Sequence, residues 1–267
     1  MQEIHALCDP TIADGDLARL LGGYATVQMH CDIESLSAAI APMRDVAVVI
    51  DARGRDPESM SALLQLLGTR HPHFPVIGRV GPDYDEFTLA LSAVEAGLVG
   101  VWVAGLEDSP AAVRHVFDHS IARAVTRSLA TSVEAIAHPS VRSFIRFCFH
   151  HVMRSMTVGS ATERIGVNSR TLARALRAYE LPRAESLIVA ARALVATRLL
   201  HNERRRVASV GAAMEVKDVK VLRRQLARLA GVRFVVERNL DAYDRQMAVW
   251  NEWLRHAATP RMDLPDE

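Results

Sequence analysis

The sequence has no long hydrophobic run, although 49% of its 267 residues are hydrophobic. A helix that spans a membrane needs about 20 consecutive, mainly apolar residues, so no membrane-spanning segment is expected. The beginning of the chain, MQEIHALCDP, has neither a basic leader nor a cleavable apolar core. These absences predict a soluble, cytoplasmic protein that has no membrane partner.

Cysteine is scarce, and its placement carries no pattern. The three cysteines, Cys8, Cys31 and Cys148, are far apart and odd in number. Neither a disulfide framework nor a zinc site is indicated by such spacing. We expect buried free thiols at these positions.

Signatures of catalysis are also absent. The sequence has no glycine-rich phosphate loop, no metal-ligand spacing and no nucleophile with an evident base partner. His71 and His73 have no third ligand nearby, so the HPHFP stretch predicts a turn and not a metal site. We therefore expect neither an enzyme nor a bound cofactor or metal.

Charge is balanced over the whole chain, at a net +1, but it is not balanced along the chain. Residues 1–118 hold seven Lys and Arg against 17 Asp and Glu, a net charge of −10. Residues 139–235 hold 19 against six, a net charge of +13. An asymmetry of this size indicates a polyanion as the partner of the basic half.

Short apolar runs alternate with segments of helical period through the acidic half. The runs are EIHALC, YATVQMH, DVAVVID, FPVIGRV and GLVGVWV, and segments such as PESMSALLQLLGTR and EFTLALSAVEAG separate them. Strands that alternate with helices predict a parallel sheet covered on both faces. Residues 1–118 are therefore predicted to form a doubly wound α/β domain with a five-stranded parallel sheet.

The rest of the chain has the periodicity of helices. Residues 119–138 are predicted to form a connector helix, and residues 139–235 an all-α domain. Within residues 236–267 we expect an amphipathic helix packed on this domain or on a dimer mate, followed by AATPRMDLPDE as a disordered tail. The apolar side of that last helix consists of Leu240, Tyr243, Met247, Trp250 and Leu254.

The stretch GVNSRTLARAL, residues 166–176, has the features of a helix-turn-helix. Gly166 can take the positive φ that ends one helix, and Asn168 can cap the next. Leu172, Leu176 and Tyr179 then face inward at helical spacing. A helix of this kind fits the major groove of double-stranded DNA. The residues on its other face are Arg170, Thr171, Arg174 and Arg177.

A second copy of this arrangement follows in RRRVASVGAAMEVKDVKVLRRQLARLAGV. A short helix through Val210 and Ala213 leads to a turn near Glu215 and Val216, and then to a basic helix. The long apolar helix ESLIVAARALVATRLL joins the two units. The basic residues of the second helix are Lys217, Lys220, Arg223, Arg224 and Arg228.

Two reading units joined by one helix, with the residues NSRTLARAL, ARALVATRLL and VLRRQLARLAGV, resemble the DNA-binding domain of the AraC/XylS family of transcriptional regulators. The resemblance covers about residues 140–235, with Thr162 in place of a usual alanine and Glu215-Val216 in place of a Gly-Phe pair. In that family each unit inserts a helix into one of two consecutive major grooves. The resemblance implies double-stranded DNA as the partner. The groove residues it implies are Arg170, Thr171 and Arg174 in the first unit, and Lys217, Lys220, Arg223 and Arg224 in the second.

The acidic half resembles a response-regulator receiver domain in strand order, spacing and size. Asp51 ends the third predicted strand, where receivers carry the phosphate-accepting aspartate, and Asp9 ends the first, where they carry a metal-binding acidic pair. Cys8 takes one acidic position, and the Ser or Thr after strand four and the Lys after strand five are missing. A phosphoryl group on Asp51 would therefore lack charge neutralisation. We expect a pseudo-receiver for dimerisation or docking of another protein, with Asp51 as a strand-end cap or a solvated residue.

The favoured interpretation is a transcriptional regulator, expected as a homodimer, that reads adjacent major grooves with its two helix-turn-helix units. Arg174 should then serve specific binding, and exposed arginines at 204–206 should serve affinity for any sequence. One alternative is an adaptor whose degenerate DNA-binding fold binds a protein. Glu215 and Asp218 favour it, Glu215 by placing negative charge toward phosphate, whereas the charge of +13 disfavours it. The other alternative is a response regulator controlled by phosphorylation of Asp51.

Overall fold

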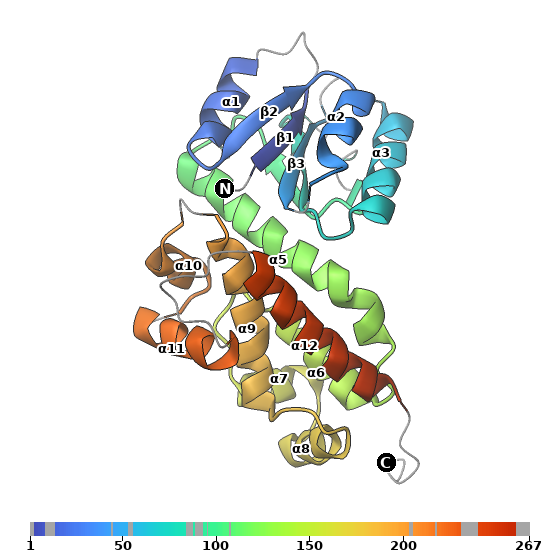
Figure 1. The fold of residues 1–267 in the computed structure, drawn as a ribbon, viewed down its shortest axis with the longest axis vertical. Helices are drawn as coiled ribbons and strands as arrows, with labels where there is room; N and C mark the ends of the chain where they lie inside the picture. The colour runs from blue at the N-terminus through green and yellow to red at the C-terminus, as the bar shows by residue number, and fades with distance from the viewer. Residues whose placement is uncertain are drawn as a thin grey trace. The chain divides into compact units, whose positions relative to one another are not determined.

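A computed structural model describes residues 3–8, 14–43, 45–52, 56–83, 88, 93–94, 96–106, 108–202, 205–216, 218–230 and 240–259 (Figure 1). The chain separates into two compact units. Unit 1 comprises Met1–Ala124 and Asn202–Arg204, and unit 2 comprises Val125–His201 and Arg205–Glu267.

Unit 1 is built on a parallel sheet of five strands in the order β2-β1-β3-β4-β5. The register places Ile4 of β1 opposite Val27 of β2 and Ala47 of β3. The predicted five-stranded parallel sheet is confirmed, and this strand order is one of the two common doubly wound orders. The strands are β1 (Glu3–Leu7), β2 (Thr26–His30), β3 (Val46–Asp51), β4 (Val76–Val80) and β5 (Gly100–Val103).

Helices cover both faces of this sheet. Val48 and Ile50 of β3 pack in a cluster with α2 (Ile33–Ile40) and α3 (Pro57–Arg70). Ala47 and Val49 pack in a second cluster with α1 (Asp14–Gly22) and α5 (Pro110–Glu134). Successive side chains of a strand point to opposite faces, so the continuous apolar run of β3 serves both layers. Figure 1 shows α2 and α3 side by side. The helix predicted at residues 86–97 lies mostly outside the described residues.

Helix α5 begins earlier than the predicted connector helix. It runs without interruption over Pro110–Glu134 and contributes to both units, since the boundary between them falls after Ala124. No glycine or proline lies between Pro110 and Pro139, so nothing in the sequence stops the helix near residue 119. The predicted connector is thus the later part of a helix whose first turns bury Val113 and Phe117 in unit 1.

Unit 2 is helical in every described residue that belongs to regular secondary structure. Its central helix is α9 (Ala184–Leu200), which packs against each of the other helices that begin within the unit. A helix that is buried nearly all round needs an apolar sequence without a polar stripe, which ESLIVAARALVATRLL supplies. The others are α6 (Pro139–His150), α7 (Val158–Ile165), α8 (Ser169–Ala178), α10 (Val207–Ala213), α11 (Val219–Ala230) and α12 (Leu240–Ala258).

Helix α12 packs on the rest of unit 2, as its apolar side predicts. Trp250 is 2% exposed and lies against Phe149 of α6, with ring centroids 4.8 Å apart. Gln246 donates a hydrogen bond to Thr197 of α9 at 3.0 Å. The tail was predicted to begin at residue 257, but α12 includes Ala257, which is fully buried and accepts a hydrogen bond from the Ala137 amide at 3.0 Å. Residues 260–267 lie outside the described part of the chain.

The three cysteines are free, and two of them are buried as expected. Burial raises the pKa of the Cys148 thiol to about 12, so this group is inert as a nucleophile at neutral pH. Cys31 is exposed, against expectation. It lies directly after β2, between that strand and the Asp32 cap of α2, where the chain turns at the surface.

Two histidines form a stacked pair in unit 1. His5 Nδ1 and His30 Nε2 are 3.0 Å apart, and the ring planes differ by 11°. His5 is fully buried. Burial is the main cause that lowers the pKa of His5, and the charge of His30 lowers it further. Burial also lowers the pKa of His30.

We expect unit 1 to lose stability as the pH falls below the unfolded value of about 6.5, because only the unfolded chain then binds protons at these histidines. Above that pH this contribution is fully present. His71, whose pKa burial also lowers, adds to the same trend. Hydrogen exchange of β1 and β2 amides at pH 7 and pH 5 measures the effect, and His30→Gln should reduce the difference. Equal protection at both pH values in the unchanged protein would contradict the expectation.

Candidate nucleic-acid interface

The first helix-turn-helix turns at Gly166, as predicted. Gly166 has φ 67° and ψ 29°, in the left-handed region that glycine adopts without strain. Its amide donates to the Glu163 carbonyl at 3.2 Å, and the Val167 amide donates to the Thr162 carbonyl at 3.0 Å. These two bonds form a Schellman motif, which satisfies the last carbonyls of α7 and ends that helix sharply.

Helix α8 begins with the predicted cap and buries the predicted face. The Asn168 side chain accepts a hydrogen bond from the Arg170 amide at 2.8 Å. Leu172 is fully buried, and Leu176 and Tyr179 are at most 4% exposed. These contacts fix which face of α8 points outward. On or beside that face Asn168, Arg170, Arg174 and Arg177 are exposed, and Thr171 is half-buried.

Helix α7 tolerates Thr162 where the family resemblance expects alanine. Thr162 is 6% exposed, and its hydroxyl donates within the helix to the Val158 carbonyl at 2.9 Å and the Gly159 carbonyl at 3.1 Å. The hydroxyl is therefore satisfied in a buried position. At the start of the helix Thr157 and Ser160 form a capping box.

The second turn repeats the hydrogen bonding of the first. The Glu215 amide donates to the Ala212 carbonyl at 3.1 Å, and the Val216 amide donates to the Gly211 carbonyl at 2.8 Å. Glu215 occupies the place of Gly166 and has φ 52°. A non-glycine residue in this region costs about 1 kcal/mol. The same Schellman motif thus ends both α7 and α10.

Asp218 caps α11 just as Asn168 caps α8. Its carboxylate accepts a hydrogen bond from the Lys220 amide at 2.7 Å. The second turn is one residue longer, because Asp218 lies three residues after Glu215, whereas Asn168 lies two after Gly166. Lys217, the predicted groove residue in this turn, lies outside the described residues.

The two caps align α11 with α8 residue by residue. Lys220 then corresponds to Arg170, Leu222 to Leu172 and Arg224 to Arg174. Leu222 is 1% exposed, so the same position points inward in both helices. Lys220, Arg223 and Arg224 are exposed. The structure therefore presents Arg170, Arg174 and Arg177 of α8, and Lys220, Arg223 and Arg224 of α11, away from the core of unit 2.

A buried arginine, which the sequence did not single out, joins the segment before α7 to the turn after α10. Arg192 of α9 is 7% exposed and donates to the carbonyl of Arg154, before α7, and to the carbonyl of Met214, at the end of α10. Burial lowers the pKa of Arg192, and the nearby Glu215 carboxylate opposes that shift.

The Glu215 carboxylate takes part in the same connection. It accepts a hydrogen bond from the Ser155 amide at 2.9 Å. The expectation that this carboxylate places its charge toward phosphate is therefore corrected. The carboxylate is instead hydrogen-bonded to a backbone amide and lies near Arg192. Glu215 compensates part of its backbone strain with a contact that glycine could not make.

The arginines at 204–206 differ from the expected exposed set. Arg205 is 4% exposed, so it is unavailable for phosphate contacts. Arg206 is exposed and Arg204 lies outside the described residues. Three consecutive arginines precede α10, and nothing in the sequence indicates which of their side chains is buried.

Asp51 in unit 1 is buried, so the expectation of a solvated side chain is wrong. It is 1% exposed, and its Oδ2 lies 3.0 Å from Nη1 of Arg79, which is 6% exposed. The Arg79 guanidinium also lies over the Trp102 ring, 5.1 Å from its centroid. The prediction missed this pair, although Asp51 and Arg79 are register partners in β3 and β4. Asp9 lies outside the described residues.

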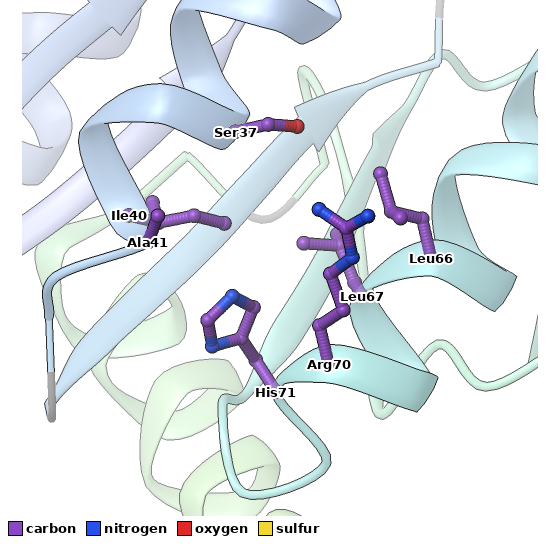
Figure 2. Close-up of a pocket in the computed structure, with 7 residues that line it drawn as sticks. All are labelled: Ser37, Ile40, Ala41, Leu66, Leu67, Arg70 and His71. Carbon is purple, nitrogen blue, oxygen red and sulfur yellow. The ribbon is translucent and has the colours of Figure 1, made fainter.

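A small pocket lies between the ends of α2 and α3 (Figure 2). It has a volume of about 200 Å³. Figure 2 shows the Arg70 guanidinium and the His71 ring between the two helices. His71 stacks on Phe74, with ring planes 4° apart, and lies in the predicted turn. The residues that line the pocket are Ser37, Ile40, Ala41, Leu66, Leu67, Arg70 and His71.

Two features are absent from the described residues. No group of three or more His, Cys, Asp or Glu side chains there could hold a metal ion. No helix there is both long and apolar enough to cross a membrane. The candidate interface of α8 and α11 is therefore the site whose described side chains form the clearest pattern.

The chain has only low similarity to known proteins. No family model and no curated protein matches the sequence. Full-length FixJ from B. japonicum is similar with a TM-score of 0.35 and 19% identity, over 86% of this chain and 98% of that chain. NtrX from Brucella abortus in complex with ATP gives 0.40 and 18%, over 58% of this chain and 35% of that one. The response regulator StyR gives 0.34 and 12%, over 80% and 98%. TM-scores this low carry no argument about function.

Proposed function

We propose that the chain is a sequence-specific regulator of transcription that binds double-stranded DNA with two helix-turn-helix units of the AraC type. In this proposal α8 and α11 enter neighbouring major grooves of one duplex. Arg170, Thr171 and Arg174 contact the first groove, and Lys220, Arg223 and Arg224 contact the second, with Lys217 beside them. Asn168 and Arg177 lie at the edges of the first contact.

The single observation that supports this proposal most is the equivalence of the two units. Each pairs a Schellman turn with a side-chain cap and then a helix that buries one leucine and exposes two basic residues at matching positions. One basic helix alone would be an ordinary solvated surface. Here two equivalent helices both pack on α9, and duplex DNA is a repeated polyanion.

The two acidic residues that favoured the adaptor alternative have structural roles. Asp218 caps α11, and Glu215 accepts a hydrogen bond from the Ser155 amide. Both acidic groups thus have structural partners, which removes the reason to expect a protein in place of DNA. Phosphorylation control is not favoured either, because Arg79 already pairs with the Asp51 carboxylate. Unit 1 then serves dimerisation or docking of another protein, and the expected assembly is a homodimer.

Duplex binding with a steep salt dependence tests the proposal. The full chain should retain duplex DNA at about 50 mM salt and lose affinity as salt rises, because the basic residues release counterions from the phosphates. Arg174→Ala should weaken a specific site by about 1–3 kcal/mol, since it removes a base contact. The measurement is a titration by fluorescence anisotropy over a series of salt concentrations.

Arg183→Ala is the matched control for this titration. Arg183 is exposed and precedes α9, outside both reading helices. Its loss should leave the preference for the specific site unchanged. If no duplex is retained at about 50 mM salt, the proposal is wrong.

A further inference from the structure

The exposed face of α11 holds one apolar side chain among its charges. Val221 is 37% exposed, and within the described residues only Val94, Leu106 and Val249 are other large hydrophobic side chains with comparable or greater exposure. It precedes Arg224 by three residues, so the two side chains are neighbours on the helix surface, and Lys220 before it is exposed as well. Val221 is therefore not one of the buried core residues of unit 2.

The alignment of the two caps gives this valine a position in the site. Val221 is the third residue after Asp218, as Thr171 is the third after Asn168. Thr171 is a predicted groove residue of the first unit. Residues near the amino end of a recognition helix reach base edges in the major groove.

We infer that Val221 contacts the C5-methyl group of a thymine in the half-site bound by α11. Thymine is distinguished in the major groove by this methyl group, and apolar side chains recognise it. A valine offers no hydrogen bond, so phosphates and the polar base edges give it no favourable contact. The inference rests on the proposed function and adds to it a base preference for the second unit.

The experiment removes the thymine methyl group from one side of the contact and the two γ-methyl groups of Val221 from the other. A duplex that the full chain selects from a random pool is remade with deoxyuridine in place of each thymine in turn, because uracil lacks the C5-methyl group. For the unchanged protein, one such replacement in the α11 half-site should weaken binding about four-fold, the value of one buried methyl group. Val221→Ala should bind the original duplex about as weakly and should lose its sensitivity to that replacement.

Val249→Ala is the matched control, because Val249 is 43% exposed and lies on α12 of the same unit. It should keep the four-fold sensitivity. If Val221→Ala stays as sensitive to deoxyuridine as the unchanged protein, or if the α11 half-site needs no thymine, the inference is wrong while DNA binding stands. If no duplex is bound at all, the proposed function and the inference both fail.

Discussion

Replacing Arg79 by Met should lower the free energy of unfolding of unit 1 by about 3–5 kcal/mol. The change removes the cation that lies 3.0 Å from the Asp51 carboxylate, and Asp51 is 1% exposed. A buried carboxylate that loses its ion-pair partner loses the attraction that offsets its desolvation. Denaturant unfolding followed by hydrogen exchange of the β3 and β4 amides measures the loss.

The double variant Asp51→Asn with Arg79→Met separates the ion pair from packing. It removes both charges and should recover much of the stability, because neutral groups of similar size can replace a buried pair at little cost. Arg70→Met, at an exposed arginine of the same unit, should change stability by less than about 0.5 kcal/mol. A loss for the double variant equal to that of Arg79→Met would contradict the buried-pair explanation.

Replacing Arg192 by Leu should lower the free energy of unfolding of unit 2 by about 3 kcal/mol. Two carbonyls, those of Arg154 and Met214, lose their donor, and each buried acceptor left without one costs about 1–3 kcal/mol. The turn before α7 and the turn before α11 also lose their connection. Specific DNA binding should therefore fall further than stability alone explains, at a temperature where the variant is still folded.

Arg192→Lys distinguishes the two carbonyl contacts from simple charge. A lysine keeps the charge, but its compact ammonium lacks the planar fork that reaches both carbonyls, so we expect an intermediate loss. Arg183→Leu is the control immediately before the same helix, where the side chain is exposed. The role of Arg192 would be disproved if Arg192→Leu unfolded at the same denaturant concentration as Arg183→Leu.

The parts of the fold that depend on local signals were predictable from the sequence. Gly166 and Asn168 mark a turn and a cap through their own backbone preferences, and the apolar run of β3 marks a strand buried on both faces. Helix α3 was predicted over the residues that it occupies, because Pro57 suits its first turn.

The contacts that were missed join residues far apart in the sequence. Arg192 contacts carbonyls 38 and 22 residues away, and carbonyls carry no mark in the sequence. Asp51 and Arg79 are 28 residues apart, and only the strand order brings them together. The sequence predicted a receiver-like parallel sheet, in which one charged residue at the end of each of two strands was the signal that could have revealed the ion pair. Exposure of Cys31 and burial of Arg205 depend on packing that no short pattern encodes.

Selection of bound duplexes from a random pool, repeated with Arg174→Ala and with Arg224→Ala, tests the central claim that both helices read DNA. The account predicts an enriched motif with two segments about 10 base pairs apart, one helical turn of the duplex. Arg174→Ala should relax the sequence preference in one segment only, and Arg224→Ala in the other. Enrichment of a single segment that Arg224→Ala leaves unchanged, or no enrichment at all, would contradict it.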